Sequence, residues 1–470
     1  MIFNIEKFRN NTAAESATGE KITYGELSSF IQTLSGQMKP RSLVFSLCEN
    51  TIGSLAGYVG FIENQMVPLL LKADLDEELL NHLIGCYQPD YFWVPKEQKE
   101  TFLTSHSEYE EAFSVYDYVL IKTGLTSYPM AEDLALLLTT SGSTGSPKLV
   151  RQSYKNIESN ARSIVEYLEL TEDERPITSL PMNYTYGLSI INSHLMVGAT
   201  LLMTTSGMLQ KEFWQFFKKK EATSIAGVPY NYEMLKRLRF LRMDLPSLRY
   251  MTQAGGKLSP ELHKEFAEFA QKTGRRFYVM YGQTEATARM SYLPYKESLR
   301  KYGSMGIAIP GGEFALIDVD GKEITEPEVV GELVYRGPNV TLGYAEHGED
   351  LIKEDERHGE LITGDMAKFD NEGYYTIVGR KKRFVKLFGN RVNLDETERM
   401  IKTAFPNLDC ACAGRDDLMK IFITDGEKTK DVKDFVSDKT GIHFSAFDVE
   451  AINTIPKNEA GKTLYKKLPL

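Results

Sequence analysis

The stretch that decides the fold reads LALLLTTSGSTGSPK and occupies residues 134–148. Its first six residues, Leu134 to Thr139, form an apolar run that predicts a buried strand. A loop of small and hydroxyl-bearing residues follows, and beyond it the segment from Asn156 to Leu168 predicts a helix. Because strand, loop and helix succeed one another directly, we expect an α/β fold with this loop beyond the carboxyl end of a sheet strand.

The loop at residues 139–148 suits a polyphosphate. Its small residues let the backbone approach an anion closely, and its N–H groups and hydroxyls supply hydrogen-bond donors. It departs from the Walker pattern, because only two residues separate Gly145 from Lys148 and Leu149 follows the lysine. An unrelated P-loop ATPase is therefore excluded, and the flanking strand and helix disfavour a flexible Gly/Ser linker.

Strand and helix patterns continue to alternate downstream. Leu248 to Gln253 and Arg276 to Met280 are strand-like, and the segment between them predicts a helix with Ser259 as N-cap and Gly274 as C-cap. The residues expected on its buried face are Leu262, Phe266 and Phe269. Alternation of this kind predicts a largely parallel sheet that is covered on both faces.

The most apolar stretch runs from Leu180 to Met203. It carries Asn183, Asn192 and His194, which hydrocarbon would leave without hydrogen-bond partners. We therefore expect buried core strands and turns here, rather than a membrane-spanning helix, and no membrane partner.

The composition of the sequence and the length of its apolar runs change from about Gly303. Glycine and proline become dense and strand-like runs are short, which indicates a β-rich subdomain. The cationic run from Gly379 to Arg383 suggests a hinge. We therefore predict an N-terminal domain over residues 1–381 and a mixed α+β C-terminal domain over 382–470. The latter has 16 Lys and Arg against 14 Asp and Glu, so it is the better suited of the two to an acidic partner.

Composition bounds the class of protein. Of 470 residues, 42% are apolar and 26% charged, and the net charge is −10, which fits a globular protein without a nucleic-acid partner. Four cysteines are too few for a disulfide scaffold. The pair Cys410 and Cys412 has no neighbouring ligand cluster, so a metal or redox site is disfavoured. The N-terminus lacks the apolar run of a signal peptide, and we expect a cytoplasmic protein.

Three further motifs carry candidate chemistry. In Tyr281-Gly282-Gln283-Thr284-Glu285, a hydroxyl and a carboxylate could bind a phosphate oxygen and Mg²⁺, although a polar turn would look the same. Asp365 could bind both hydroxyls of a ribose or act as a turn carboxylate. Lys462 lies on a glycine-bearing loop from which it could neutralise developing negative charge, or it could simply be solvated.

Taken together, in this order and spacing, these motifs resemble the acyl-adenylate-forming superfamily. Its members include acyl-CoA synthetases, adenylation domains of peptide synthetases, carrier-protein ligases and firefly luciferase. The resemblance covers most of the chain, from about Leu134 to Lys462. It implies a large N-terminal domain of two doubly covered sheets plus a β-rich subdomain, followed by a small mobile α+β C-terminal domain.

The resemblance also implies roles for the motif residues. Those implied in holding ATP are Thr140, Ser141, Gly142, Ser143, Thr144, Gly145, Lys148, Tyr281, Gly282, Asp365 and Arg380, with Tyr281 at the adenine and the last two at the ribose. The implied catalytic residues are Thr284, Glu285 as the Mg²⁺-linked glutamate, and Lys462. Lys382 falls at the hinge, and Gly389 falls in the loop that faces the thiol.

The implied reaction is the attack of a carboxylate on MgATP, which gives acyl-AMP, followed by transfer to a phosphopantetheine thiol of CoA or an acyl carrier protein. Tyr184 replaces a histidine common in the family, and the aspartate that binds an amino-acid ammonium group is absent. With the substrate pocket implied at Tyr184, Tyr186, Gly255 and Gly256, we favour a small or aromatic carboxylic acid. The alternative is a non-catalytic nucleotide- or acyl-binding protein on the same fold.

Overall fold

The computed structural model describes residues 2–139, 148–388, 390–415, 417–458, 461 and 463–469. The chain forms two compact units: Met1–Phe314 with Tyr335–Leu361, and Ala315–Val334 with Ile362–Leu470. These units are defined by how compactly their residues pack. The boundary expected between residues 381 and 382 is instead a point of rotation, which packing does not test. The two-domain boundary therefore stays a prediction.

The first unit contains an eight-stranded sheet of order β18-β9-β8-β4-β3-β5-β7-β6. The strands β8, β4, β3 and β5 run parallel, and the remaining strands join antiparallel at the two edges. In chain order the strands are β3 (Leu43–Cys48), β4 (Val67–Lys72), β5 (Tyr91–Pro95), β6 (Glu110–Val115), β7 (Tyr118–Lys122), β8 (Leu134–Thr139), β9 (Leu149–Ser153) and β18 (Gly343–Ala345).

Helices cover both faces of this sheet. Successive side chains of a strand point to opposite faces, and in β8 both faces are buried: Leu136 and Leu138 join one core cluster while Leu137 joins another. The first cluster packs on α2 (Ile52–Glu63) and α5 (Tyr154–Leu168), and the second on α3 (Glu77–Tyr87) and α4 (Lys99–Ser105). Burial on both sides explains why the strand reads as a continuous apolar run.

A second sheet in the same unit has five strands in the order β11-β12-β13-β14-β15. Its first three strands are parallel and the last two antiparallel. The strands are β11 (Ser224–Gly227), β12 (Tyr250–Gln253), β13 (Arg276–Tyr281), β14 (Ser291–Tyr292) and β15 (Ile307–Ala308). A small third sheet consists of β10 (Leu201–Met203), β1 (Thr12–Ser16) and β2 (Lys21–Thr23). The remaining helices are α1 (Tyr24–Ser35), α7 (Lys211–Lys219) and α8 (Pro229–Arg237).

The helix α9 (Pro260–Thr273) confirms the signals at its two ends. Ser259 accepts a hydrogen bond from the Leu262 N–H over 3.2 Å, and Gly274 ends the helix with φ +68°. Phe266 is buried against the sheet as expected, but Phe269 is only half-buried.

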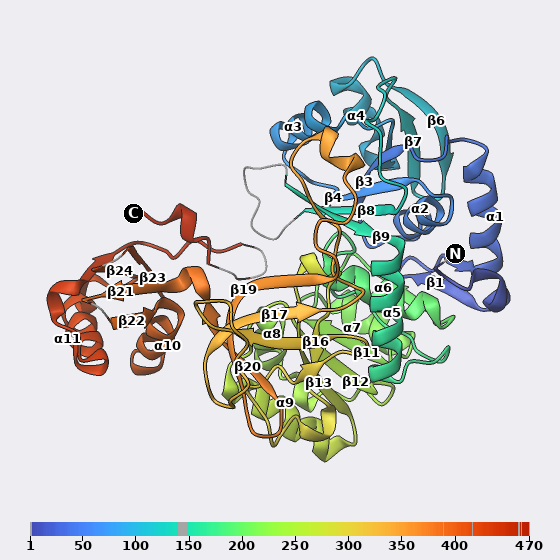
Figure 1. The fold of residues 1–470 in the computed structure, drawn as a ribbon. Helices are drawn as coiled ribbons and strands as arrows, with labels where there is room; N and C mark the ends of the chain where they lie inside the picture. The colour runs from blue at the N-terminus through green and yellow to red at the C-terminus, as the bar shows by residue number, and fades with distance from the viewer. Residues whose placement is uncertain are drawn as a thin grey trace. The chain divides into compact units, whose positions relative to one another are not determined.

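The expectation of strands and turns from Leu180 to Met203 was wrong, because this stretch contains the helix α6 (Thr185–Met196) before β10. Figure 1 shows α6 beside α5, both between the two large sheets. Every residue of α6 after Thr185 is buried, so the helix lacks the polar face that reveals a helical period. Its polar groups are satisfied internally; Asn192, for example, accepts a hydrogen bond from the Tyr58 hydroxyl over 2.9 Å.

The second unit begins in a four-stranded sheet of order β16-β17-β19-β20, through which the division between the units passes. Its strands are β16 (Glu313–Ile317), β17 (Gly331–Arg336), β19 (Glu360–Phe369) and β20 (Tyr375–Arg380). Further along lie the hairpin β21 (Phe384–Leu387) and β22 (Asn390–Asn393), and a sheet of β23 (Cys410–Arg415), β24 (Leu418–Ile423) and β25 (Phe447–Ala451). The helices α10 (Leu394–Ala404) and α11 (Thr429–Thr440) pack on the last sheet. The α/β class with a smaller α+β part is thus confirmed.

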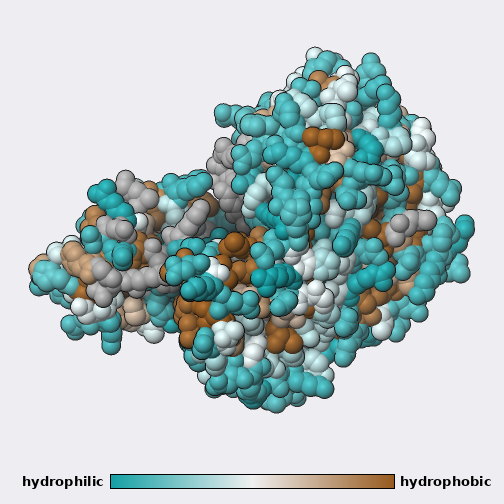
Figure 2. Space-filling view, in the orientation of Figure 1, coloured by the Kyte–Doolittle hydropathy of each residue, from teal (hydrophilic) through white to brown (hydrophobic). Residues whose placement is uncertain are grey.

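The surface and the core divide by polarity. The face in Figure 2 is mostly hydrophilic, with small separate hydrophobic areas.

Cys410 and Cys412 are buried in the second unit's core, and burial raises the pKa of Cys410 to about 12, as for an unreactive packing residue. Among the described residues, no three His, Cys, Asp or Glu side chains gather as a metal site. None of the helices in the described ranges has both the length and the apolar character needed to cross a membrane.

Candidate active site

The segment after β13 turns sharply, and Gly282 makes the turn feasible. A Cβ atom at Gly282 would lie 1.6 Å from the carbonyl oxygen of Ala288, so no other residue fits. Thr284–Ala286 then forms one short 3₁₀ turn. Tyr281 and Glu285 are half-buried, whereas Thr284 is buried. The turn therefore places the predicted adenine, phosphate and magnesium residues together at the carboxyl end of a parallel strand.

Glu285 is positioned by a tyrosine that is distant in sequence. The Tyr344 hydroxyl donates a hydrogen bond to Oε1 of Glu285 over 2.7 Å. Burial, and then the nearby Glu285 charge, raise the pKa of Tyr344 to about 12, so the phenol keeps its proton at neutral pH. Within the described part of the chain, Oε2 of Glu285 has no hydrogen-bond or ion-pair partner. One carboxylate oxygen is thus fixed, and the other is unpartnered among the described residues.

Two cations lie over the ring of Tyr344. The Lys148 ammonium is 3.7 Å and the Arg357 guanidinium carbon 4.6 Å from the ring centroid. Arg357 also donates to the backbone oxygen of Glu285 over 3.0 Å and to the Thr341 hydroxyl over 2.6 Å. A half-buried carboxylate with an available oxygen, beside two cations, suits a polyanion that carries a divalent cation.

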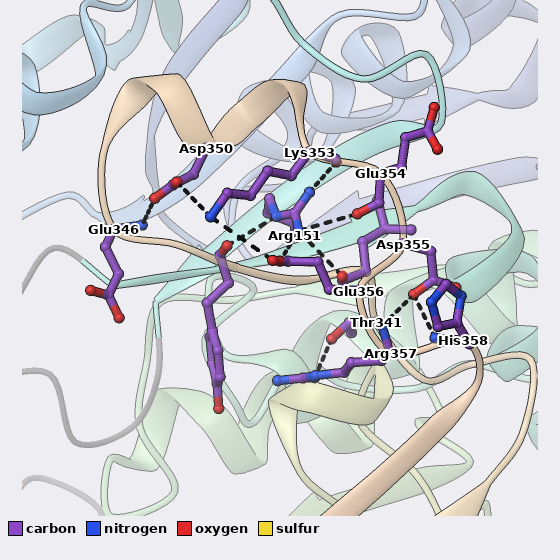
Figure 3. A network of polar contacts seen from close by, with 12 residues as sticks. Arg151, Thr341, Glu346, Asp350, Lys353, Glu354, Asp355, Glu356, Arg357 and His358 are labelled. Carbon is purple, nitrogen blue, oxygen red and sulfur yellow. Dashed lines mark hydrogen bonds and ion pairs between the residues drawn. The ribbon is translucent and has the colours of Figure 1, made fainter.

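A buried arginine, Arg151, contacts the segment that precedes Arg357, including Lys353, Glu354 and Glu356 (Figure 3). Arg151 in β9 is fully buried, and it pairs with Glu356 over 2.5 Å. Its guanidinium also donates to the backbone oxygens of Leu342, Tyr344, Lys353 and Glu354. One side chain thereby fixes the whole of residues 342–356 against the strand that follows the phosphate loop. Carbonyl acceptors and a carboxylate together compensate the buried charge.

Only the ends of the predicted phosphate loop belong to the described chain. Thr139 closes β8, and Lys148 precedes β9 and pairs with Glu346 over 3.4 Å. The predicted ligands Thr140, Ser141, Gly142, Ser143, Thr144 and Gly145 lie outside the described residues. The described residues on either side of the loop are therefore Thr139 and Lys148, and the Lys148 ammonium lies over the Tyr344 ring.

The residues predicted to line the acid pocket lie near the start of α6 and the ends of β11 and β12. A Cβ atom at Gly255 would come within 2.5 Å of the Tyr184 hydroxyl, so the tyrosine covers this glycine closely. Gly256 packs on Pro229 in the same way. Burial raises the pKa of Tyr184 to about 12. Tyr186 lies deeper: it is buried, and its hydroxyl bonds that of Thr252 over 2.8 Å.

In the second unit, the structure brings the two predicted ribose residues together. Asp365 in β19 is buried, and its carboxylate lies 3.3 Å from Nε of Arg380 at the end of β20, opposite it in the register of the two strands. Lys382 belongs to the short 3₁₀ turn Lys381–Arg383 that follows. Gly389 and Lys462 lie outside the described residues.

Three residues of the site escaped prediction from the sequence: Arg151, Tyr344 and Arg357. Arg151 follows the apolar residues Leu149 and Val150, which is a weak signal of a buried charge. Tyr344 and Arg357 carry no local signal, because their partners Glu285 and Lys148 are more than fifty residues away in the chain.

The fold and the site together define an α/β protein with a carboxylate and two cations gathered around Tyr344, near the carboxyl end of a parallel strand, a place where nucleotide-binding enzymes commonly hold their ligands. The chain belongs to the AMP-binding enzyme family, whose model matches residues 3–345.

Among its relatives, the oxalate–CoA ligase of Arabidopsis thaliana is 32% identical over 286 residues, which are 60% of this chain and 54% of that protein. The long-chain-fatty-acid–CoA ligase of Escherichia coli O157:H7 is 29% identical and matches 72% of this chain and 61% of that protein. The matched region thus spans less than two thirds of these relatives' length.

The fold also matches solved structures over nearly the whole chain. The o-succinylbenzoate CoA synthetase of Bacillus subtilis with its acyl-adenylate has a TM-score of 0.78 at 20% identity, covering 99% of this chain and 97% of that one. ATP-bound MatB of Rhodopseudomonas palustris has a TM-score of 0.78 at 23% identity, with the same coverage. These likenesses establish a shared fold.

Proposed function

We propose that this chain is an ATP-dependent, AMP-forming ligase that activates a carboxylic acid as its acyl-adenylate and transfers the acyl group to the thiol of CoA. The observation that carries the proposal is Glu285, fixed by Tyr344 and flanked by Lys148 and Arg357. A binding protein has no need of a carboxylate with one oxygen held and the other left for a cation. The two relatives described above are named as acid–CoA ligases, which supports the same activity.

In the first half-reaction, a carboxylate oxygen attacks the α-phosphorus of ATP and pyrophosphate leaves. Two anions must approach each other, so positive charge and hydrogen-bond donors lower the barrier. Lys148 and Arg357 supply that charge, and Glu285 would hold Mg²⁺, which neutralises phosphate oxygens. Tyr281 would stack on the adenine, while Asp365 and Arg380 would hold the ribose. Lys462 would neutralise charge at the reacting carboxylate.

In the second half-reaction, the thiol sulfur attacks the acyl carbonyl carbon and AMP leaves. We propose a rotation of the small domain about Lys382, which withdraws Lys462 and brings the Gly389 loop to the thiol. CoA is the acceptor that the relatives' names support, and a holo carrier protein is the second acceptor to test. We propose a small or aromatic acid, because the polar-tipped ring of Tyr184 closes over Gly255.

ATP–pyrophosphate exchange across a panel of acids, followed by thioester formation with CoA or a holo carrier protein, tests this function. Lys462→Ala should abolish the exchange but spare transfer from presynthesised acyl-AMP. Lys466→Ala, which removes an exposed lysine of the same segment, is the matched control and should keep both activities. Release of ADP and phosphate, or nucleotide binding without exchange, would contradict the ligase and favour an ATPase or a non-catalytic binder respectively.

A further inference from the structure

The chain on either side of Lys462 is paired main chain to main chain. Lys457 and Thr463 form an antiparallel bridge, and the Leu464 N–H donates to the Pro456 oxygen over 2.8 Å. Residues 458–462 lie between the paired positions, and we call them the lysine loop. Because the two ends of so short a stretch are fixed to each other, its placement depends on what holds the paired base.

Lys457 attaches the base on the side that precedes the lysine loop. Its ammonium pairs with Oδ2 of Asp409 over 2.5 Å, and Lys402 in α10 pairs with Oδ1 of the same carboxylate over 3.3 Å. The side chains of Lys457 and Asp409 are 39% and 33% exposed. Solvent screens an ion pair of this exposure, so it holds the base only weakly.

Tyr465 attaches the base on the side that follows the lysine loop. The Arg383 guanidinium carbon lies 3.8 Å from the centroid of the Tyr465 ring, and the Tyr465 hydroxyl donates to Oε2 of Glu398 over 3.1 Å. Burial raises the pKa of Tyr465, so the phenol keeps the proton that it donates. A cation over the ring and a carboxylate at the hydroxyl therefore hold this side chain at two points.

Arg383 is itself fixed in the core of the second unit. Its Nε donates to Asp395 over 2.7 Å, while its two Nη atoms donate to the Cys412 carbonyl oxygen and to Glu398, each over 2.5 Å. The Arg383 side chain is only 13% exposed. A planar guanidinium with three such acceptors has one orientation, so the position of the Tyr465 ring follows from that of Arg383.

The stacked pair joins two parts of the chain that the proposed reaction uses. Arg383 directly follows Lys382, the proposed hinge residue, and ends the same 3₁₀ turn. Tyr465 follows Lys462 by three residues, so at most about 10 Å of chain joins the two. One buried contact thus connects the residues just beyond the hinge with the segment that carries the proposed catalytic lysine.

We propose that Tyr465 is a positioning residue for Lys462. Stacked on Arg383 and bonded to Glu398, it makes the lysine loop move as one body with the residues that follow the hinge. This inference rests on the proposed role of Lys462 and adds the residue that presents it. It concerns adenylate formation alone, because the thiol step as proposed uses the Gly389 loop instead of the lysine.

Tyr465→Leu, which removes both contacts, tests the proposal in the full-length enzyme. We expect kcat of ATP–pyrophosphate exchange to fall about 10–100-fold, because a small displacement of a catalytic group has an effect of this size. The KM values for ATP and acid should stay within about twofold of wild type, since the displaced group acts on the reaction and not on binding. Thioester formation from presynthesised acyl-AMP and CoA should keep the wild-type rate.

The comparison of the two half-reactions separates positioning from a structural role. A small domain that has lost its packing would slow both half-reactions, whereas a displaced lysine slows only the first. Tyr465→Phe keeps the ring over Arg383 and loses one hydrogen bond, so it should retain most of the exchange. Arg383→Lys keeps the charge but loses the planar stack, and it gives the same test if Tyr465→Leu does not fold.

Tyr302→Leu is the matched control, because Tyr302 is a tyrosine of the first unit that is 47% exposed, and both half-reactions should be unchanged. Wild-type exchange in Tyr465→Leu, or an equal loss of both half-reactions, would overturn this inference while Lys462→Ala still lost exchange alone. Full exchange in Lys462→Ala would instead overturn the role of that lysine in the proposed function.

Discussion

The Tyr344 hydroxyl and the Glu285 carboxylate are joined by a hydrogen bond of 2.7 Å, although they lie 59 residues apart in the chain. Tyr344 is held in turn by Arg151, whose guanidinium has only hydrogen-bond donors. Its Nε donates to the backbone oxygen of Tyr344 over 3.1 Å. The carboxylate proposed to hold Mg²⁺ is therefore oriented by two successive residues. Partners of this kind commonly decide how well a metal ligand performs.

Tyr344→Phe tests that orientation. The ring stays under Lys148 and Arg357, while the hydroxyl's hydrogen bond to Glu285 and its polar interaction with Arg357 are lost. We expect the Mg²⁺ concentration for half-maximal pyrophosphate release to rise about tenfold, within the range typical of such partners. A magnesium titration at saturating ATP measures the change. An unaltered titration curve would contradict a role of the Tyr344 hydroxyl in positioning Glu285 for the metal.

Gly282→Ala should disrupt the turn before Thr284. The added methyl group would overlap the Ala288 oxygen, and a backbone atom cannot move aside cheaply. We expect a loss of about 3 kcal/mol of stability, together with loss of pyrophosphate exchange. Chemical denaturation and the exchange assay give the two readouts.

The matched control for that variant is Gly85→Ala in α3, where nothing lies within 4 Å of the added atom. Alanine favours a helix, so this variant should gain about 0.5–1 kcal/mol and keep full activity. A stable and active Gly282→Ala enzyme would show that the tight approach to Ala288 is dispensable.

Glu398 in α10 is the centre of a buried ionic cluster in the second unit. Its Oε1 accepts from Arg383 over 2.5 Å and from the Cys412 N–H over 2.7 Å, while Tyr465 donates to Oε2 over 3.1 Å. Glu398→Gln removes one of two carboxylates that pair with Arg383, the other being Asp395 at 2.7 Å, which should cost about 1.5–3 kcal/mol. Hydrogen exchange of peptides from α10 and β23 would report the loss.

The exposed pair of Arg399 and Glu396 on the same helix offers the control. Arg399→Ala should cost less than about 1 kcal/mol, because solvent screens this pair. Equal exchange behaviour of the two variants would mean that the buried cluster contributes no more than a surface pair.

His194 in α6 should make stability depend on pH. Its Nδ1 donates to the Ile190 carbonyl over 2.7 Å and its Nε2 accepts from Tyr250 over 2.8 Å, so the ring is neutral; burial lowers its pKa to about 4. In the unfolded chain His194 is protonated as pH falls below about 6.5, whereas in the folded protein it stays neutral until about pH 4. Stability is therefore complete above pH 6.5 and falls as pH decreases toward 4.

Urea midpoints measured between pH 4.5 and 7 would show the effect. His194→Gln should reduce the slope by up to about 1.4 kcal/mol per pH unit. His263, whose pKa burial also lowers to about 4, should add an equal and independent share. A wild-type slope retained in the His194→Gln variant would place the protonation elsewhere.

Local sequence patterns predicted what depends on neighbours in the chain. The apolar run of β8 and the caps of α9 are such features, and the structure confirms them. The helix α6 escaped because it is buried all round, and such a stretch has no polar face to mark its period. The turn at residues 281–285 could be located from its motif, but the partner that orients Glu285 could not.

The charged residues within the core were the hardest to foresee. Arg151 finds its partners about 190–205 residues later in the chain, and only the closed fold brings them together. Arg289 has no protein counter-charge at all in the described chain, so no pairing rule could have identified it. Its contacts with Ser189 and Tyr167 cross between separate elements, which a linear pattern cannot express.

The attachment of residues 342–356 to Arg151 has a practical consequence for recombining this enzyme with its relatives. The segment is held largely by backbone oxygens, which every donor sequence supplies, so its side chains other than Tyr344 and Glu356 can vary as long as the arginine is inherited with it. A crossover between β9 and β18 that discards Arg151 would remove the side chain that holds residues 342–356. The chimera would lose these contacts even if each parental half folded well.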